Sequence, residues 1–367
     1  YGTMVAGLEA NGFPFTASSE ISTISAVGDV NGNGDLELVF GTSGGTLYAL
    51  TKLGAEYLVY EQPDTIKSSP VLADINSDGI LDIVFISVNA NTSTLFVIND
   101  EGEDLNGFPV NIFERIVSGP AVADLDNDSI LDIILTSTQN NVIVFESNGT
   151  LRDGFPYETS GSLKHGATIV DINNDQDLEI LVGNVNGDLY LINQNGSLMT
   201  SSYVEGSVIS EISVADLDDN GELELLFTTS LNDQYENQML HVYNPTSQSE
   251  IYGWPISLSE LSFSEPIIAD LDNDNSLDII AVNSIGQLSA ISDSGSLLEY
   301  FPINYGTSFS SAPMVIDYDS DGDLEIVTGS SGDLMILDYK NQVNSDLSSW
   351  SLFKGGYERK GFYSGEG

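Results

Sequence analysis

The sequence contains no cysteine, so its fold can use neither disulfide bonds nor thiol chemistry. Basic residues are also scarce, because 9 Lys and Arg stand against 56 Asp and Glu and the formal net charge is −47. Nucleic acids and anionic membrane surfaces are therefore poor partners, since neutralising phosphate requires Lys and Arg. No apolar run reaches the roughly 18 residues of a membrane-spanning helix. These absences favour a soluble, acidic protein.

The acidic residues are concentrated in a nine-residue loop, seen most clearly at Asp317–Glu325. Oxygen-bearing side chains occupy its places one, three, five and nine, and Gly322 occupies place six. Calcium prefers six to eight oxygen ligands, and a glycine at place six permits the sharp turn. An EF-hand needs a bidentate Glu at place twelve, where Thr328 stands instead. The β-like residues after Glu325 predict a calcium loop within a β-hairpin.

This loop occurs seven times, at spacings of 45 to 54 residues. Internal repeats of that length are typical of propellers, solenoids and arrays. We expect up to seven Ca²⁺ ions, held by side chains at places one, three, five and nine and by the backbone carbonyl at place seven. The candidate ligands at these places are Asp29, Asn31, Asn33, Asp35, Glu37, Asp74, Asn76, Asp78, Ile80, Asp82, Asp124, Asp126, Asp128, Ile130, Asp132, Asp171, Asn173, Asp175, Asp177, Glu179, Asp216, Asp218, Asn220, Glu222, Glu224, Asp270, Asp272, Asp274, Ser276, Asp278, Asp317, Asp319, Asp321, Asp323 and Glu325.

The seven loops differ in charge and in the residue at place six. The third, sixth and seventh loops each carry four carboxylates at places one, three, five and nine, and the first carries two. Place six also requires positive φ, which suits Gly322 and disfavours Gln176. We therefore expect the seventh loop to bind calcium most tightly, and the first and fourth to lose it first.

Each repeat reads as four short strands, and the pattern predicts an all-β, seven-bladed β-propeller with four-stranded blades. An aromatic residue followed by proline stands sixteen residues before the loop in five repeats, at Phe13, Phe108, Phe155, Trp254 and Phe301. Because proline cannot donate to a sheet ladder, we place this pair at the outer edge of a blade. Phe13 has no blade of its own, so residues 1–15 are expected to complete the last blade and close the ring.

With these features, residues of roughly 8–340 resemble the FG-GAP/VCBS repeat family, the calcium-loop β-propellers that include the integrin α-subunit head. The resemblance rests on the motif D-x-[DN]-x-[DN]-x-x-x-[DE], although Ser129, Gln176 and Asn275 replace glycine at place six. It implies that the calcium loops share one face and leave the opposite face for ligands. It also implies an extracellular adhesion or recognition module.

The predicted domains are a propeller over residues 1–341 and a basic, aromatic tail over residues 342–367. The tail has two interpretations, docking on its own ring or binding a partner. Longer loops at Asn89–Ser93 and Leu231–Gln238 are either ligand loops or tolerated insertions. The chain begins at Tyr1 without a signal peptide, and resting cytosol is poor in calcium, so we expect a processed or excised fragment that is secreted or at the cell surface.

Signals for catalysis are weak. The only histidines, His165 and His241, lie at a strand entrance and within a strand, and no H-E-x-x-H or phosphate-binding glycine loop is present. We therefore expect a non-catalytic module that binds protein or glycan on the face opposite the calcium loops, without nucleic acid or membrane insertion. Two alternatives stay open: a structural subunit of a surface assembly or filament, with possible self-assembly, and a calcium-dependent polysaccharide lyase or hydrolase.

Overall fold

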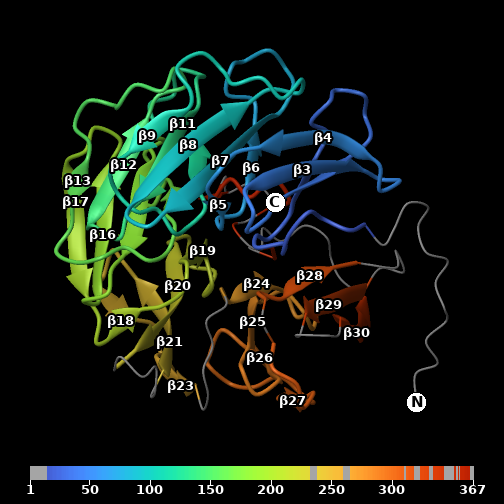
Figure 1. Cartoon of the computed structure of the whole chain (residues 1–367). Coiled ribbons are helices and arrows are strands. Elements are labelled where there is room, and N and C mark those ends of the chain that lie inside the picture. The colour runs from blue at the N-terminus through green and yellow to red at the C-terminus, as the bar shows by residue number, and fades with distance from the viewer. Residues whose placement is uncertain are drawn as a thin grey trace.

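The computed structural model describes residues 15–231, 238–258, 265–309, 311–317, 323–329, 334–342, 351–352, 354 and 356–363. These residues form seven small sheets that stand around a common centre, as Figure 1 shows, and they include no α-helix. Accordingly, this part of the chain has no helix that could cross a membrane. The architecture is the all-β, seven-bladed propeller that the sequence predicts.

The strands of the first four sheets follow the repeats along the chain. The first sheet holds β1 (Ala26–Gly28), β2 (Glu37–Gly41), β3 (Thr46–Thr51) and β4 (Glu56–Glu61). The second holds β5 (Thr65–Ile66), β6 (Val71–Ala73), β7 (Asp82–Asn89), β8 (Thr92–Ile98) and β9 (Val110–Ile112). The third holds β10 (Ala121–Ala123), β11 (Asp132–Thr136), β12 (Asn141–Phe145) and β13 (Tyr157–Glu158). The fourth holds β14 (Thr168–Val170), β15 (Glu179–Gly183), β16 (Asp188–Asn193) and β17 (Leu198–Tyr203).

The remaining three sheets repeat the arrangement. The fifth holds β18 (Ser207–Val208), β19 (Ser213–Ala215), β20 (Glu224–Ser230), β21 (Gln238–Asn244), β22 (Ser249–Glu250) and β23 (Ile256–Leu258). The sixth holds β24 (Ile267–Ala269), β25 (Asp278–Val282), β26 (Gln287–Ile291) and β27 (Ile303–Asn304). The seventh holds β28 (Met314–Ile316), β29 (Asp323–Gly329) and β30 (Leu334–Gln342). A last short strand, β31 (Phe362–Tyr363), pairs in parallel with β14.

The hydrophobic core lies between neighbouring sheets. One apolar cluster joins the first and second sheets through side chains such as Leu47 and Phe85. Equivalent clusters join the second to the third, the third to the fourth and the fourth to the fifth sheet, and one further cluster spans the fifth to the seventh. Strands in the inner half of the sheets, such as β6, β11 and β15, are buried on both faces, which explains why they read as unbroken apolar runs rather than as alternating patterns.

The aromatic–proline pairs lie where the sequence predicts. The pairs at Phe108, Phe155, Trp254 and Phe301 each come directly before the outermost strand of a sheet, and their peptide bonds to proline are cis. Each aromatic ring is buried. The fifth pair, at Phe13, lies outside the described residues, as does the predicted fourth strand of the last sheet. Phe15 packs edge-on against Tyr48, with ring centroids 5.2 Å apart, on the face of the first sheet that points away from the second.

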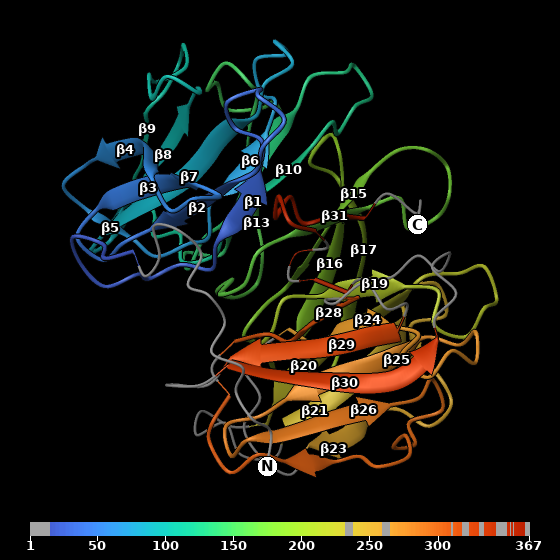
Figure 2. The same ribbon diagram turned by 90° about the vertical axis from the view of Figure 1, so that its right-hand side faces the viewer.

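The C-terminal segment runs through the centre of the ring and contacts one inner strand after another. The amides of Val27, Leu72, Val122 and Ile169 donate to the carbonyls of Tyr357, Glu358, Lys360 and Gly361 at 2.8–3.0 Å. β31 is visible beside these strands in Figure 2. Of the two interpretations of the tail, docking on its own ring is therefore the one that the structure shows. Of the two longer loops, Asn89–Ser93 is the tip of the β7–β8 hairpin, and residues 232–237 lie outside the described part.

Candidate metal centres and the opposite face

Each candidate calcium loop joins an inner strand to the second strand of its sheet, and six of them share one hydrogen-bond pattern. The place-one Asp accepts hydrogen bonds from the amides of places five and six, at 3.0–3.2 Å and 2.7–3.2 Å. The side chain at place five accepts from the amide of place seven at 2.7–2.9 Å. These bonds fix the carboxylates in place and leave further lone pairs free, since an ionised carboxylate can accept about four hydrogen bonds.

The backbone explains which residues the loop prefers. Place six has positive φ in all six loops, between 68° and 90°, including Ser129 at 68° and Gln176 at 75°. The demand for positive φ at place six is therefore confirmed. Place four also has positive φ, as in Gly32 at 67° and Asn174 at 58°, which was not predicted. Its residues are Gly, Ser, Asn or Asp, a signal that was present in the sequence.

The place-nine carboxylates are the most informative feature of these loops. All seven are buried, with exposed fractions of 0–3 %. In six loops the carboxylate accepts a hydrogen bond from the amide of place two at 2.9–3.4 Å. The second oxygen of Glu37 is buried without a hydrogen-bond partner. A buried carboxylate is costly unless a cation or donor compensates it, so these side chains fit a bound cation.

Burial also changes the protonation of these groups. Desolvation raises the pKa of Asp82 and Asp132 to about 6, and that of Glu179, Glu224 and Asp278 to about 7. The other carboxylates of the same loops raise the values further, and the amide donors lower them. A divalent cation among the same oxygens would favour the ionised form and reverse the shift.

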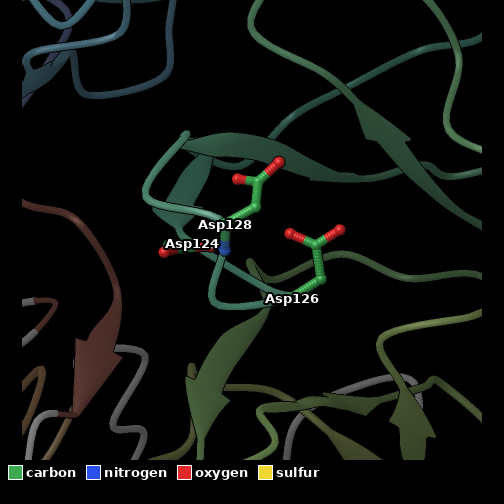
Figure 3. A group of neighbouring side chains, drawn as sticks. All are labelled: Asp124, Asp126 and Asp128. Atoms are coloured by element: carbon green, nitrogen blue, oxygen red, sulfur yellow. Dashed lines mark hydrogen bonds between the residues drawn. The ribbon is translucent and has the colours of Figure 1, made fainter.

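Three loops bring carboxylate oxygens close enough to share one cation. The sets are Asp124, Asp126 and Asp128; Asp216, Asp218 and Glu224; and Asp270, Asp272 and Asp278, with one oxygen of each residue within 4.8 Å of the others. Figure 3 shows the first set on the loop between β10 and β11. An all-oxygen, carboxylate-rich set suits a hard cation such as calcium. Three acidic groups that could hold metal ions are thus present among the described residues.

The remaining predicted ligands divide into two groups. The loops that begin at Asp29, Asp74 and Asp171 have the shared hydrogen-bond pattern, but they do not bring three carboxylate oxygens within 4.8 Å of one another. In the seventh loop, Asp317 and the buried Glu325 are described, whereas Asp319, Asp321 and the side chain of Asp323 fall outside the described part.

Arg152 contacts the third loop, which was not predicted from the sequence. Its guanidinium donates to Asp126 and to Asp132, each at 2.7 Å. These aspartates stand at places three and nine of the third loop, so the Arg152 guanidinium contacts two candidate calcium ligands. Arg152 is 15 % exposed, which makes the two contacts stronger than ordinary surface ion pairs. The position of Arg152 in the sequence relative to the loop does not predict this contact.

The two histidines differ in their surroundings. His241 is buried on β21, stacks on Phe227 and contacts Thr229 and Glu250 through its two ring nitrogens at 2.8 and 2.7 Å. Both nitrogens are therefore engaged within the sheet. His165 is half-buried near the centre of the ring, and burial lowers its pKa to about 4, so it is neutral at physiological pH.

A cavity of about 540 Å³ opens at the end of the central channel. Its lining includes the residues that precede the inner strands of all seven repeats, among them Thr23, Ser68, Ser118, His165 and Glu211. The candidate calcium loops follow the same inner strands. The cavity and the loops therefore lie at opposite ends of the channel. We call this cavity the channel mouth.

Comparisons with known proteins agree with this architecture. A family model described as an FG-GAP-like repeat matches residues 74–135 and 124–182, so residues 74–182 consist of FG-GAP-like repeats and the resemblance is confirmed there. No curated protein matched the sequence.

Solved structures with similar folds share little sequence with this chain. Sqt1 of Saccharomyces cerevisiae is 12% identical, with a TM-score of 0.63 over 83% of this chain and 82% of that one. A chain in the crystal structure of BBS1N in complex with ARL6DN is 14% identical, with a TM-score of 0.59 over 89% and 95% of the two chains. The WD40 β-propeller domain of Doa1 is 15% identical, with a TM-score of 0.53 over 89% and 94%. At these identities the likeness concerns the fold alone.

Proposed function

We propose that this chain is an extracellular, non-catalytic recognition or adhesion module that binds a protein or a glycan at the face opposite the metal loops. Calcium in the loops is structural in this proposal. The observation that carries it is the separation of the two ends of the channel. One end carries buried carboxylates that fit cations, and the other carries an open cavity to which every repeat contributes.

The structural role of calcium follows from where the loops lie. Each loop forms the connection between an inner strand and its neighbour, and its place-nine carboxylate is buried beside the core. A cation there would compensate buried charge and fix the hairpin, in a chain that has no disulfide bonds to do so. The extracellular setting is supported by the same loops, because weak calcium sites fill only where calcium is abundant.

Binding screens test the function. The calcium-loaded protein is applied to a glycan array and used in a pull-down, with the channel-mouth variant Ser118→Trp as a matched control that blocks the cavity. Binding that depends on an open channel mouth is the expected result. A ligand that binds both proteins equally would place recognition elsewhere and contradict the proposal.

Two further measurements address the alternatives. Light scattering after size-exclusion chromatography should show a monomer, and a concentration-dependent polymer would favour a structural subunit. A turnover screen on acidic polysaccharides should show no product, and cleavage that needs calcium would favour a lyase or hydrolase.

A further inference from the structure

We propose that the channel mouth binds the carboxylate group of an acidic saccharide, with Lys67 and Lys164 as the cationic side chains that contact it. This inference rests on the proposed function and names the ligand class for the same face.

The nine basic residues are not spread evenly over the molecule. Lys52, Arg152 and Lys360 pair with nearby carboxylates, outside the channel mouth. Lys67 and Lys164 both line the channel mouth, both are exposed, and neither forms an ion pair within the described part of the chain. They come from different repeats, the second and the fourth, and the fold brings them to the same cavity.

Two acidic residues also line the channel mouth, but the tail compensates their charge. Glu265 accepts a hydrogen bond from the amide of Lys354 at 3.1 Å, and the ammonium of Lys354 lies 3.9 Å from Glu211. The half-buried Arg359 interacts electrostatically with Glu265. Two basic side chains of the tail thus offset the two acids, and Lys67 and Lys164 remain as uncompensated positive charge.

The strong overall negative charge does not prevent an anion from binding at this end. The calcium loops begin six residues after Ser68 and its equivalents, which corresponds to about 20 Å of extended chain. This exceeds the Debye length of about 8 Å at physiological ionic strength, so the loop carboxylates are largely screened from the channel mouth. Bound calcium would reduce their charge further.

The rest of the lining favours a saccharide over an acidic peptide. Hydroxyl groups predominate among the polar side chains, and they belong to Ser22, Thr23, Ser68, Ser69, Ser118, Ser284 and Ser311. Ser68 is 2 % exposed, and its hydroxyl is buried without a hydrogen-bond partner. Apolar side chains such as Ile21 and Phe309 line the same cavity. A compact cavity of about 540 Å³ lined by hydroxyls and apolar groups matches a short sugar, which has polar hydroxyl groups and apolar ring faces. An extended peptide instead needs a groove or a sheet edge.

Isothermal titration of the calcium-saturated protein tests this inference with three probes. These are a galacturonic acid disaccharide, the same disaccharide with its carboxyl groups reduced to alcohols, and a tetraglutamate peptide. The variants are Lys67→Gln, Lys164→Gln and, as a control with the same charge change at the other end of the channel, Lys52→Gln. Contacts to a charged group are worth enough that each mouth variant should weaken the acidic disaccharide about tenfold or more. Lys52→Gln should change its affinity less than twofold.

The outcomes separate this inference from the function on which it rests. Binding of the acidic disaccharide that both mouth variants weaken, together with weak binding of the reduced form, supports it. Equal binding by the mouth variants, equal binding of the reduced disaccharide, or a preference for tetraglutamate would each overturn it. If all three probes fail while the screens yield a neutral glycan or a protein that needs the open channel mouth, this inference is wrong and the proposed function stands. If Ser118→Trp changes none of the binding that the screens detect, the proposed function itself fails.

Discussion

Arg152 should weaken calcium binding in the third loop, and Arg152→Gln should therefore tighten it. The guanidinium donates to one oxygen each of Asp126 and Asp132, which are two of the predicted calcium ligands. A cation that takes these oxygens must displace Arg152 or share them with it. By charge alone the third loop belongs among the tightest, so Arg152 changes the order that carboxylate number predicts.

The contacts set the size of the effect. Hydrogen bonds to charged groups contribute about 1.5–3 kcal/mol each, and Asp132 is buried whereas Asp126 is exposed. Loss of one such contact on calcium binding corresponds to a roughly ten- to hundredfold weaker affinity. In the calcium-free protein, Arg152→Gln should lower the free energy of unfolding by about 2–3 kcal/mol, because Asp132 loses its counter-charge. Thermodynamic linkage requires that calcium weakens the Arg152 contacts by the same free energy by which Arg152 weakens calcium binding.

Calcium titration by calorimetry, with melting curves in chelator and in calcium, measures both effects. Lys52→Gln is the control, because Lys52 is 60 % exposed and contacts only Asp35, at place seven, where the backbone carbonyl is the predicted ligand. Asp124→Asn identifies the third-loop binding step, and the effect of Arg152→Gln should vanish in that background. A third-loop step that Arg152→Gln leaves unchanged or weakens would refute the reasoning.

Three further predictions concern stability. In chelator the melting temperature should fall as the pH rises from 5 to 8, because burial raises the pKa of Asp82, Glu179 and Asp278 above the unfolded values. The folded state then binds more protons than the unfolded state and loses stability as these groups ionise. Excess calcium should abolish this fall, and a chelated protein that gains stability over the same range would contradict the prediction. Gln176→Gly should raise the free energy of unfolding by about 1 kcal/mol and tighten calcium binding by the fourth loop, since φ of residue 176 is 75°. Gly79→Gln, where a side chain would meet no neighbour, should lower the free energy of unfolding by a similar amount if backbone strain is the cause. Lys354→Ala should lower the free energy of unfolding by about 3–5 kcal/mol, because it removes a buried ammonium and leaves the half-buried Glu211 without its counter-charge. Glu211→Gln should restore part of the loss, and full stability of the single variant would show that the contact is unimportant.

Sequence alone predicts the repeat, the blade number and the loop geometry, because these depend on local patterns. The Asp at place one accepts hydrogen bonds from places five and six of the same loop. The resulting turn needs the same residue types in each of the repeated loops. The outer-strand position of the aromatic–proline pairs follows in the same way, since Phe108 and Trp254 stand at one fixed distance from the loop.

Contacts between separate segments of the chain are beyond such patterns. Arg152 reaches Asp126 from the neighbouring turn between β12 and β13, and Lys354 reaches Gly119 from more than two hundred residues away. The meeting of Lys67 and Lys164 at one cavity likewise depends on how the sheets are arranged around the centre. The basic character of the tail indicates docking on an acidic body, but it does not indicate which acids it meets.

The central claim, that calcium in the loops is structural, is tested most directly by counting bound calcium and melting the same sample before and after chelation. One site filled at a hundredfold excess over its Kd contributes about 2.7 kcal/mol, so several sites rival the roughly 5–15 kcal/mol that stabilises an ordinary domain. We expect several calcium ions per chain, and a melting temperature that falls by tens of degrees when they are removed at low salt. A sample shown to be free of metal that melts at the same temperature would contradict the account.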